Sequence, residues 1–361
     1  MRQLPVKFLS SWIAVGLITG VFIATPGNAG DEHKFNQPGN ILITDQFNNR
    51  VIEMAHDGDI VWHFGLGPND SSPKSIIGTN DAERAGDLTL MSGTGIPAGV
   101  DSIFPNGVAD NRVILVNREG EIVWQYGTFG VTGSDLNQLN TPVQNTFLPN
   151  GNILITDQGN ERIIEVRRSD KQIVWQYGMT GVSGIGPNQL NNPNAAELLA
   201  NGHILISDEN NNRAIEVTHT TPSQIIMTFT AGGTASGMAF ASRLPDGNTL
   251  LTDSNNSRIV EVDKSDNVIF AYFTNDPHGN TSPLPTRAVK LANGNILISD
   301  QFNDRVIEIN AEKQIVKSYG TLNTSGFNRH NASVMNAPYS AYVIGDYTGI
   351  TPPFGFGNGD N

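Results

Sequence analysis

Short apolar stretches alternate with polar turns along most of this chain, and one such pattern recurs. The segment from Gly39 to Glu53 places the apolar run Ile41 to Ile43 between Gly-Asn and Thr-Asp, and a second apolar pair follows Arg50. Near copies of this segment begin at Gly151, Gly202, Gly247 and Gly294. Because β-branched runs bounded by Asn, Asp and Gly are typical of short strands joined by tight turns, the pattern predicts an all-β repeat protein.

The copies share the skeleton Asp-x-x-Asn-x-Arg, followed by two apolar residues and a Glu. Its members are Asp45, Asn48, Arg50, Asp157, Asn160, Arg162, Asp208, Asn211, Arg213, Asp253, Asn256, Arg258, Asp300, Asn303 and Arg305. A partial sixth copy surrounds Arg112, where counting back puts Gly107 at the Asp position and Asp110 at the Asn position. Successive arginines lie 45 to 62 residues apart, a spacing that fits four short strands with their turns and is typical of propeller blades.

Turn residues divide one repeat into four strands. In the copy that contains Arg162 we expect strands A to D at residues 143–148, 152–156, 162–166 and 172–177, with strand A innermost. A convincing strand A is missing before Gly39, whereas Pro338 to Asp346 has the pattern of a strand A with nothing after it. The sequence therefore predicts a six-bladed β-propeller of four-stranded blades, closed by a C-terminal strand that completes the first blade.

Specific motifs resemble known repeat families. The run from Gly184 to Pro193, followed by Ile204 to Asp208 and Asn212-Arg213, resembles a full NHL repeat, and Leu136 to Pro142 opens another. The strand ending Ile-Val-Trp-Gln-Tyr-Gly is similar to pyrroloquinoline-quinone-like and arylsulfotransferase-like repeats; it contains Trp124 and Trp175, with a variant at Trp62. The resemblance spans residues 39–348 and implies the propeller fold, but such propellers include binding modules, lyases, transferases and hydrolases.

The N-terminus has the order of a secretory signal. Arg2 and Lys7 precede an apolar run at residues 8–24, and Gly27-Asn28-Ala29 supplies small residues for cleavage. We therefore expect a signal peptide at residues 1–29, a periplasmic or secreted propeller at 30–348 and a C-terminal tail at 349–361. Later runs are too short to cross a bilayer, so we expect no stable membrane insertion after signal removal.

Composition narrows the classes of partner and site. The formal net charge is −13, from 35 acidic and 22 basic residues, which disfavours nucleic acid and suits a cation, a neutral ligand or a basic protein patch. The absence of cysteine excludes disulfides and thiolate chemistry. The seven histidines have no zinc-ligand spacing, so we predict no cofactor, although calcium held by Asp and carbonyl oxygens in the channel stays compatible with the sequence.

Residues that repeat in five blades are expected to be structural. In the B to C loop, Asp can accept backbone N–H groups, Asn tolerates a left-handed turn and Arg can donate to free carbonyls. We also expect pairing between blades by the Glu that follows each motif Arg and packing between blades by the strand D Trp. These glutamates are Glu53, Glu165, Glu216, Glu261 and Glu308.

Residues that differ between blades are better candidates for ligand binding. The B to C and D to A loops share one face, here called the loop face, where the innermost strands begin around the channel. Just after the Pro of each blade, the residues differ: Gln144, Asn194, Arg287 and Tyr339. They fit a ligand site or a water-filled polar channel equally well, and Glu197, Lys290 and Tyr342 lie farther along the same strands.

The second blade breaks the symmetry most. Residues 66–96 exceed any other connection between blades, and we expect an insertion at about 66–85 on the loop face that acts as a lid or a partner contact. Asp70, Asp81, Glu83 and Arg84 lie within it. A tolerated surface loop is the alternative interpretation.

Three functions fit this sequence. The first is a binding module that presents its loop face and polar channel to a protein, a glycan or a small-molecule ligand. The second is an arylsulfotransferase-like or lyase-like enzyme, for which His330 with Arg287 is the candidate catalytic pair and His278 a further acid-base candidate. The third is a structural or assembly subunit that associates through the insertion.

Overall fold

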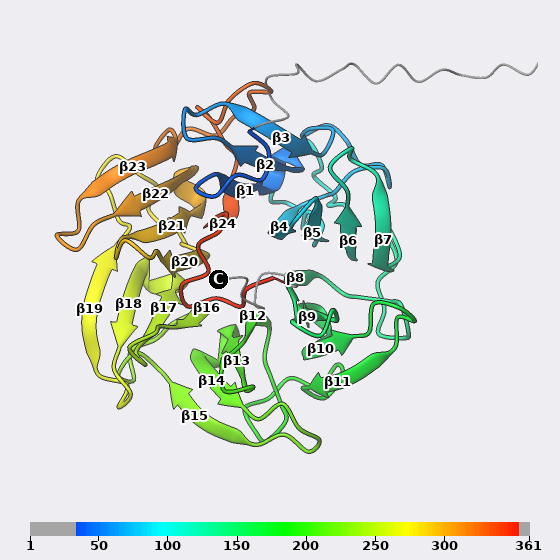
Figure 1. Ribbon diagram of the computed structural model, residues 1–361, viewed down its shortest axis with the longest axis vertical. Helices are drawn as coiled ribbons and strands as arrows, with labels where there is room; N and C mark the ends of the chain where they lie inside the picture. The colour runs from blue at the N-terminus through cyan, green and yellow to red at the C-terminus, as the bar shows by residue number, and fades with distance from the viewer. Residues whose placement is uncertain (1–33, 354–361) are drawn as a thin grey trace, which may run out of the picture. The chain divides into compact units, whose positions relative to one another are not determined.

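The structure is a computed structural model that describes residues 34–353. The predicted signal peptide at 1–29 and the end of the predicted tail at 354–361 lie outside the described residues. Within residues 34–353, the strands form six antiparallel sheets of four strands each, and Figure 1 shows these sheets arranged as blades around a common centre. The prediction of a six-bladed β-propeller is confirmed.

The first three blades take up residues 41–177 together with the C-terminal strand. Blade 1 contains β24 (Pro338–Val343), β1 (Ile41–Asp45), β2 (Arg50–Met54) and β3 (Ile60–Phe64). Blade 2 contains β4 (Thr79–Ala85), β5 (Leu88–Gly93), β6 (Arg112–Val116) and β7 (Ile122–Gly127). Blade 3 contains β8 (Pro142–Phe147), β9 (Ile153–Asp157), β10 (Arg162–Val166) and β11 (Ile173–Tyr177), within one residue of the expected bounds.

The other three blades have the same strand order. Blade 4 contains β12 (Pro193–Leu198), β13 (Ile204–Asp208), β14 (Arg213–Val217) and β15 (Ile225–Phe229). Blade 5 contains β16 (Met238–Arg243), β17 (Thr249–Asp253), β18 (Arg258–Val262) and β19 (Val268–Phe273). Blade 6 contains β20 (Arg287–Lys290), β21 (Ile296–Asp300), β22 (Arg305–Ile309) and β23 (Ile315–Gly320).

The ring closes in blade 1, where the C-terminal strand β24 pairs antiparallel with β1. Ile41 lies opposite Val343, and Ile43 lies opposite Ala341. Two backbone hydrogen bonds extend the pairing, from Gly39 N to Ile344 O at 2.9 Å and from Ile344 N to Asn40 O at 2.8 Å. This pairing covers the inner edge of β1, as the sequence predicted.

The expected insertion at 66–85 is wrong, because its second half is the innermost strand of blade 2. Residues 79–85 form β4, which pairs with β5, so this part of the predicted insertion is a strand of the sheet. The long segment is instead the B to C connection at residues 94–111. Asp110 takes the part of the motif Asp there, since its Oδ2 accepts a hydrogen bond from Arg112 Nη2 at 3.2 Å.

The repeated motif joins the B to C loop to the preceding D to A loop. In blade 3, Asp157 Oδ2 accepts from Asn160 Nδ2 and Arg162 Nε, both at 2.8 Å, while its Oδ1 accepts from the backbone N of Asn140, also at 2.8 Å. Arg162 Nη2 donates to the carbonyl oxygen of Ser134 at 3.1 Å. These bonds satisfy backbone groups that two irregular loops would otherwise leave unpaired.

We expected the motif Asn to have the left-handed conformation in this loop. The residue after it has that conformation instead. Glu161 has a φ of 58° and its side chain accepts a hydrogen bond from Asn192 N in the next D to A loop at 2.5 Å. Asn49, Asn111, Asn212 and Asp304 make the equivalent bonds to Gly78, Thr141, Gly237 and Ala337. This position therefore links each of these blades to its neighbour, whereas the motif Asn holds the Asp carboxylate.

Tryptophan and glutamate side chains add further links between blades. Trp62, Trp124 and Trp175 each donate their indole N–H to a carbonyl of the next blade, on Arg118, Arg168 and Thr220 respectively. Four of the repeated glutamates pair with a residue of the following blade: Glu53 with Arg84, Glu165 with His219, Glu216 with Arg243 and Glu261 with Lys290. Glu308 differs, because it pairs with Lys317 of its own blade at 3.0 Å.

The expected tail from residue 349 begins as an ordered strap across the ring. Thr351 is 2% exposed, and both its backbone N and its Oγ1 donate to Glu197 Oε2, at 2.8 and 2.6 Å. Figure 1 shows this C-terminal segment running over the centre of the ring. Among residues 34–353, we find no helix with the length and apolar character needed to span a membrane.

Candidate ligand site at the mouth of the channel

The innermost strands β4, β8, β12, β16, β20 and β24 contact one another in sequence and enclose the centre of the ring. In five sheets the innermost strand has an extra residue near its start. In blade 4, for example, Pro193 pairs with Asp208 and Ala195 with Ser207, which leaves Asn194 unpaired. Because such a β-bulge re-aims side chains, two successive residues of one strand can face the channel.

Two residues from every blade line a single cavity at this level. They are Asn80, Asp81, Val143, Gln144, Asn194, Ala195, Ala239, Phe240, Thr286, Arg287, Tyr339 and Ser340. The volume in which the centre of a water molecule can move is about 10 Å³. The cavity therefore holds about one water. The side chains thus nearly fill the mouth of the channel.

All four residues predicted for ligand binding line this cavity. Gln144 and Arg287 occupy the second lining position of their strands, whereas Asn194 and Tyr339 occupy the first. Asp81 of blade 2, which we expected in the insertion, and Phe240 of blade 5 were not predicted to line it. A proline at the start of the strand or just before it located this position in the other four blades, and β4 and β16 have none there.

Arg287 is the only cation among the lining residues. Its Nη1 donates to Asp81 Oδ1 at 2.8 Å, and its Nη2 lies 3.6 Å from Glu197 Oε1. The guanidinium carbon is 4.4 Å from the centroid of the Phe240 ring, and Nε has no hydrogen-bond partner in the described part of the chain. Since Asp81 already neutralises it, Arg287 is not free to attract an anion.

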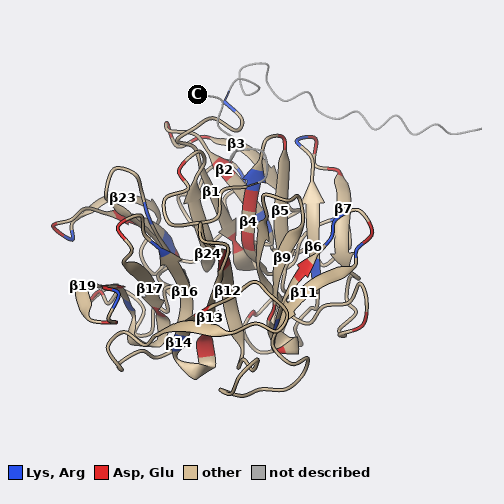
Figure 2. Cartoon of the chain, turned by 60° about the horizontal axis from the view of Figure 1, so that its bottom comes forward, with Lys and Arg blue, Asp and Glu red and all other residues tan. Residues whose placement is uncertain are grey.

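Carboxyl groups outnumber cations around Arg287. Burial raises the pKa of Asp81 and of Glu197, and the Arg287 charge opposes the rise in both. The pKa of Glu83 lies well above its ordinary value, first because of burial and then because Glu197 and Asp81 repel its charge. Figure 2 shows acidic (red) and basic (blue) segments on β4. The field in the channel is negative whenever these acids are ionised.

Neutral polar groups complete the mouth. Gln144 Nε2 donates to Glu197 Oε1 at 2.6 Å, and the hydroxyl of Tyr339 donates to Asn194 Oδ1 at 3.1 Å. Asn194 Nδ2 in turn donates to Glu209 Oε2 at 2.9 Å. Burial raises the pKa of Tyr339, so its hydroxyl stays protonated and can donate.

The remaining candidates do not join this site. Lys290 pairs with Glu261 at 2.8 Å, and the Tyr342 hydroxyl accepts a hydrogen bond from the backbone N of Arg84. His330 and His278 are exposed in D to A loops, and no bond connects His330 with Arg287 in residues 34–353. The described residues also contain no group of three or more His, Cys, Asp or Glu side chains arranged to hold a metal.

The insertion at 94–111 packs over the loop face beside the mouth. Its Ile96 belongs to an apolar cluster with Phe47 of blade 1, and its Phe104 and Val108 pack against the same cluster. Phe302, from the B to C loop of blade 6, packs there as well. The insertion therefore packs with loops of two other blades.

Comparison with known proteins shows the fold. No protein-family model and no curated protein matches the chain. A solved streptogramin B lyase is 15% identical, with a TM-score of 0.53 over 80% of both chains. A protein of unknown function from Bacteroides caccae is also 15% identical, with a TM-score of 0.58 over 84% of this chain and 98% of its own. Such low identities establish the propeller fold alone.

Proposed function

We propose that this protein is an exported binding module, built of NHL-like repeats, whose recognition centre is the mouth of the central channel. One observation carries the proposal: the twelve lining residues come in equal number from every blade and yet differ from blade to blade. The motif residues outside the channel are near copies by comparison. Residues that are the same in each blade can stabilise a closed ring. Selecting a ligand requires residues that differ between the blades.

The size and charge of the mouth select the kind of group it binds. A space for about one water cannot take a drug-sized ligand, so the ligand inserts a small terminal group while the rest of it lies on the loop face. The carboxyl groups of Asp81, Glu83 and Glu197 outnumber the single guanidinium of Arg287. This balance of charge favours a cationic group on the ligand. The ammonium of a lysine side chain on a protein partner has this size and charge.

The proposal is tested with a lysine-containing peptide and the same peptide acetylated on the lysine. We expect saturable binding of the first alone in calorimetry, and tighter binding as pH rises, because the cation favours ionised Glu83. Glu83→Gln should weaken binding about tenfold and remove most of this pH dependence. A control, Glu308→Gln, removes a carboxylate of β22 that pairs with Lys317 and does not line the mouth. Equal binding of both peptides, or an unchanged affinity in Glu83→Gln, would contradict the proposal.

Export is a separate part of the proposal and rests on the sequence of residues 1–29. The expected mature N-terminus is Gly30, which Edman sequencing of protein from the native source determines. The enzyme alternative gains no support from the site, since His330 and Arg287 make no bond to each other in the described residues.

A further inference from the structure

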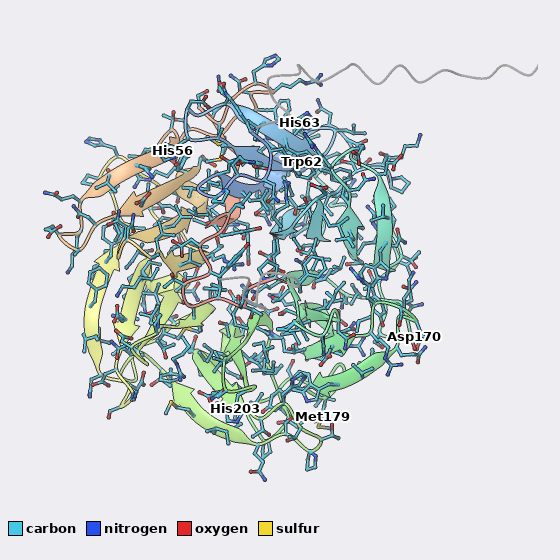
Figure 3. All side chains as sticks on the ribbon, viewed as in Figure 1. His56, Trp62, His63, Asp170, Met179 and His203 are labelled. Carbon is cyan, nitrogen blue, oxygen red and sulfur yellow. The ribbon has the colours of Figure 1, made fainter. Side chains whose placement is uncertain are left out.

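A second recess lies on the loop face where the loop after blade 6 meets blade 1. Its volume is about 120 Å³, and it is lined by Arg50, His63, Gly65, Leu66, Phe327 and Arg329. Figure 3 marks His63 and its neighbour Trp62 on β3, the outermost strand of blade 1. None of the lining residues belongs to the channel mouth, so this recess is independent of the proposed function.

Three of the lining residues depart from the repeat. His63 stands where blades 2 and 3 have Gln125 and Gln176, whose amides donate to the carbonyls of Gly127 and Gly178. Phe327 and Arg329 lie in a segment bounded by the bridge between Ser325 and Met335. That segment is three residues longer than the equivalent one bounded by Ser183 and Leu190. Three residues that depart from the repeat therefore lie together at the junction of blades 6 and 1.

The recess is cationic. Burial of part of the imidazole lowers the pKa of His63, and the charges of Arg50 and Arg329 lower it further. The Asp45 carboxylate is bound to Arg50, whose Nη1 also donates to the carbonyl of Asn328 at 2.6 Å. No acidic side chain is part of the described lining, so the Arg329 charge and the proton-accepting His63 have no counter-ion there.

One wall of the recess is flat and apolar. The Phe327 ring lies 4.7 Å from the Arg50 guanidinium carbon and remains 39% exposed. Leu66 is 62% exposed beside it. A ligand here can place a ring on Phe327 and Leu66 while an anionic group meets Arg329 and His63.

We infer that this recess binds a carboxylate carried on an aromatic ring. The carboxylate accepts hydrogen bonds from Arg329 and from protonated His63, and the ring covers the exposed apolar wall. Because an anion stabilises the imidazolium, binding raises the pKa of His63, and affinity increases as pH falls through that pKa. Arg50, Arg329 and His63 are the charged or titratable lining groups, and only His63 titrates near neutral pH.

NMR of the His63 imidazole tests the inference, with benzoate, acetate and benzamide as probes. We expect benzoate to shift the His63 signals saturably and to raise its pKa, acetate to bind more weakly and benzamide to leave the pKa unchanged. Arg329→Gln should weaken benzoate binding about tenfold. Arg167→Gln is the matched control, because it removes an arginine that is half exposed and paired with Asp170 on another blade.

His63→Gln separates a ligand contact from a structural effect, since Gln occupies the same position in blades 2 and 3. This variant should keep the wild-type melting temperature and lose the pH dependence of benzoate binding. The inference is overturned if benzoate leaves the His63 pKa unchanged, if benzamide shifts the signals equally, or if Arg329→Gln binds benzoate as tightly as Arg167→Gln does.

Discussion

Arginines with the same chemistry have two different tasks in this ring. Arg162 and its counterparts donate to loop carbonyls and to the motif Asp, so they hold irregular backbone in place. Arg287 instead meets side chains from other blades, namely Asp81 of blade 2 and Phe240 of blade 5. The first arrangement can be repeated in every blade, whereas the second needs a different residue from each neighbour. This contrast separates arginines that support the loops from Arg287, the arginine that lines the channel mouth.

Asp304 gives a prediction about pH. Burial raises its pKa to about 6, and repulsion by Asp45 and Asp300 adds to the rise. A folded pKa above the unfolded value of about 3.9 means that the folded state favours the proton. The stability that this proton contributes is complete below about pH 4 and is lost as pH rises through about 6.

Asp304→Asn should therefore stabilise the protein at neutral pH. Asn occupies the equivalent left-handed position at residues 49, 111 and 212, and its amide oxygen can still accept the hydrogen bond from Ala337 N. We expect the free energy of unfolding at pH 7 to rise by about 1–2 kcal/mol and its decline between pH 4 and 6 to become shallower. Urea unfolding at both pH values measures this, and a less stable variant at pH 7 would show that the charge is needed.

Comparing individual strands shows which ones the sequence pattern could predict. The strands of blade 3 were predictable because their β-branched runs end in Asn-Gly turns and an intact motif. β4 was missed because its sequence, Thr-Asn-Asp-Ala-Glu-Arg-Ala, has no apolar alternation. Its Asp81 and Glu83 belong to the polar channel rather than to solvent, and only the closed ring creates that environment. In blade 2 the 94–111 insertion changes the spacing between the motif Asp and the motif Arg. Counting back from Arg112 therefore put Asp110 at the Asn position, although it does the work of the motif Asp.

The strap at the C-terminus gives a prediction at the scale of an element. Thr351 Oγ1 donates to Glu197 and accepts from Leu198 N at 2.9 Å, so Thr351→Val leaves two buried polar groups short of a partner. We expect a loss of about 1–3 kcal/mol in the free energy of unfolding. Thr348→Val is the control, because within residues 34–353 the hydroxyl of Thr348 bonds to Asp346 of its own turn. Equal losses in urea unfolding of the two variants would mean that the strap contributes nothing through Thr351.

At the scale of the whole molecule, the ring depends on one strand from the far end of the chain. β24 supplies Tyr342 to the apolar cluster between blades 1 and 2 and Ala341 to another cluster that contains Ile43 and Ile52. It also carries Tyr339 and Ser340 into the channel mouth. The same six residues, Pro338–Val343, therefore contribute both to the packing between blades and to the lining of the channel mouth.

Deleting residues 338–361 should consequently abolish cooperative unfolding as well as binding at the channel. The deletion exposes the edge of β1, which promotes association through strand pairing, and removes two of the lining residues. A synthetic peptide of residues 338–353 should restore both a cooperative urea transition and the lysine-peptide binding, because main-chain pairing with β1 needs no covalent link. A truncated chain that unfolds cooperatively without the peptide would show that five complete blades and a three-stranded one suffice. In that case the ring would be held mainly by the links between blades, and the C-terminal strand would serve chiefly to complete the mouth of the channel.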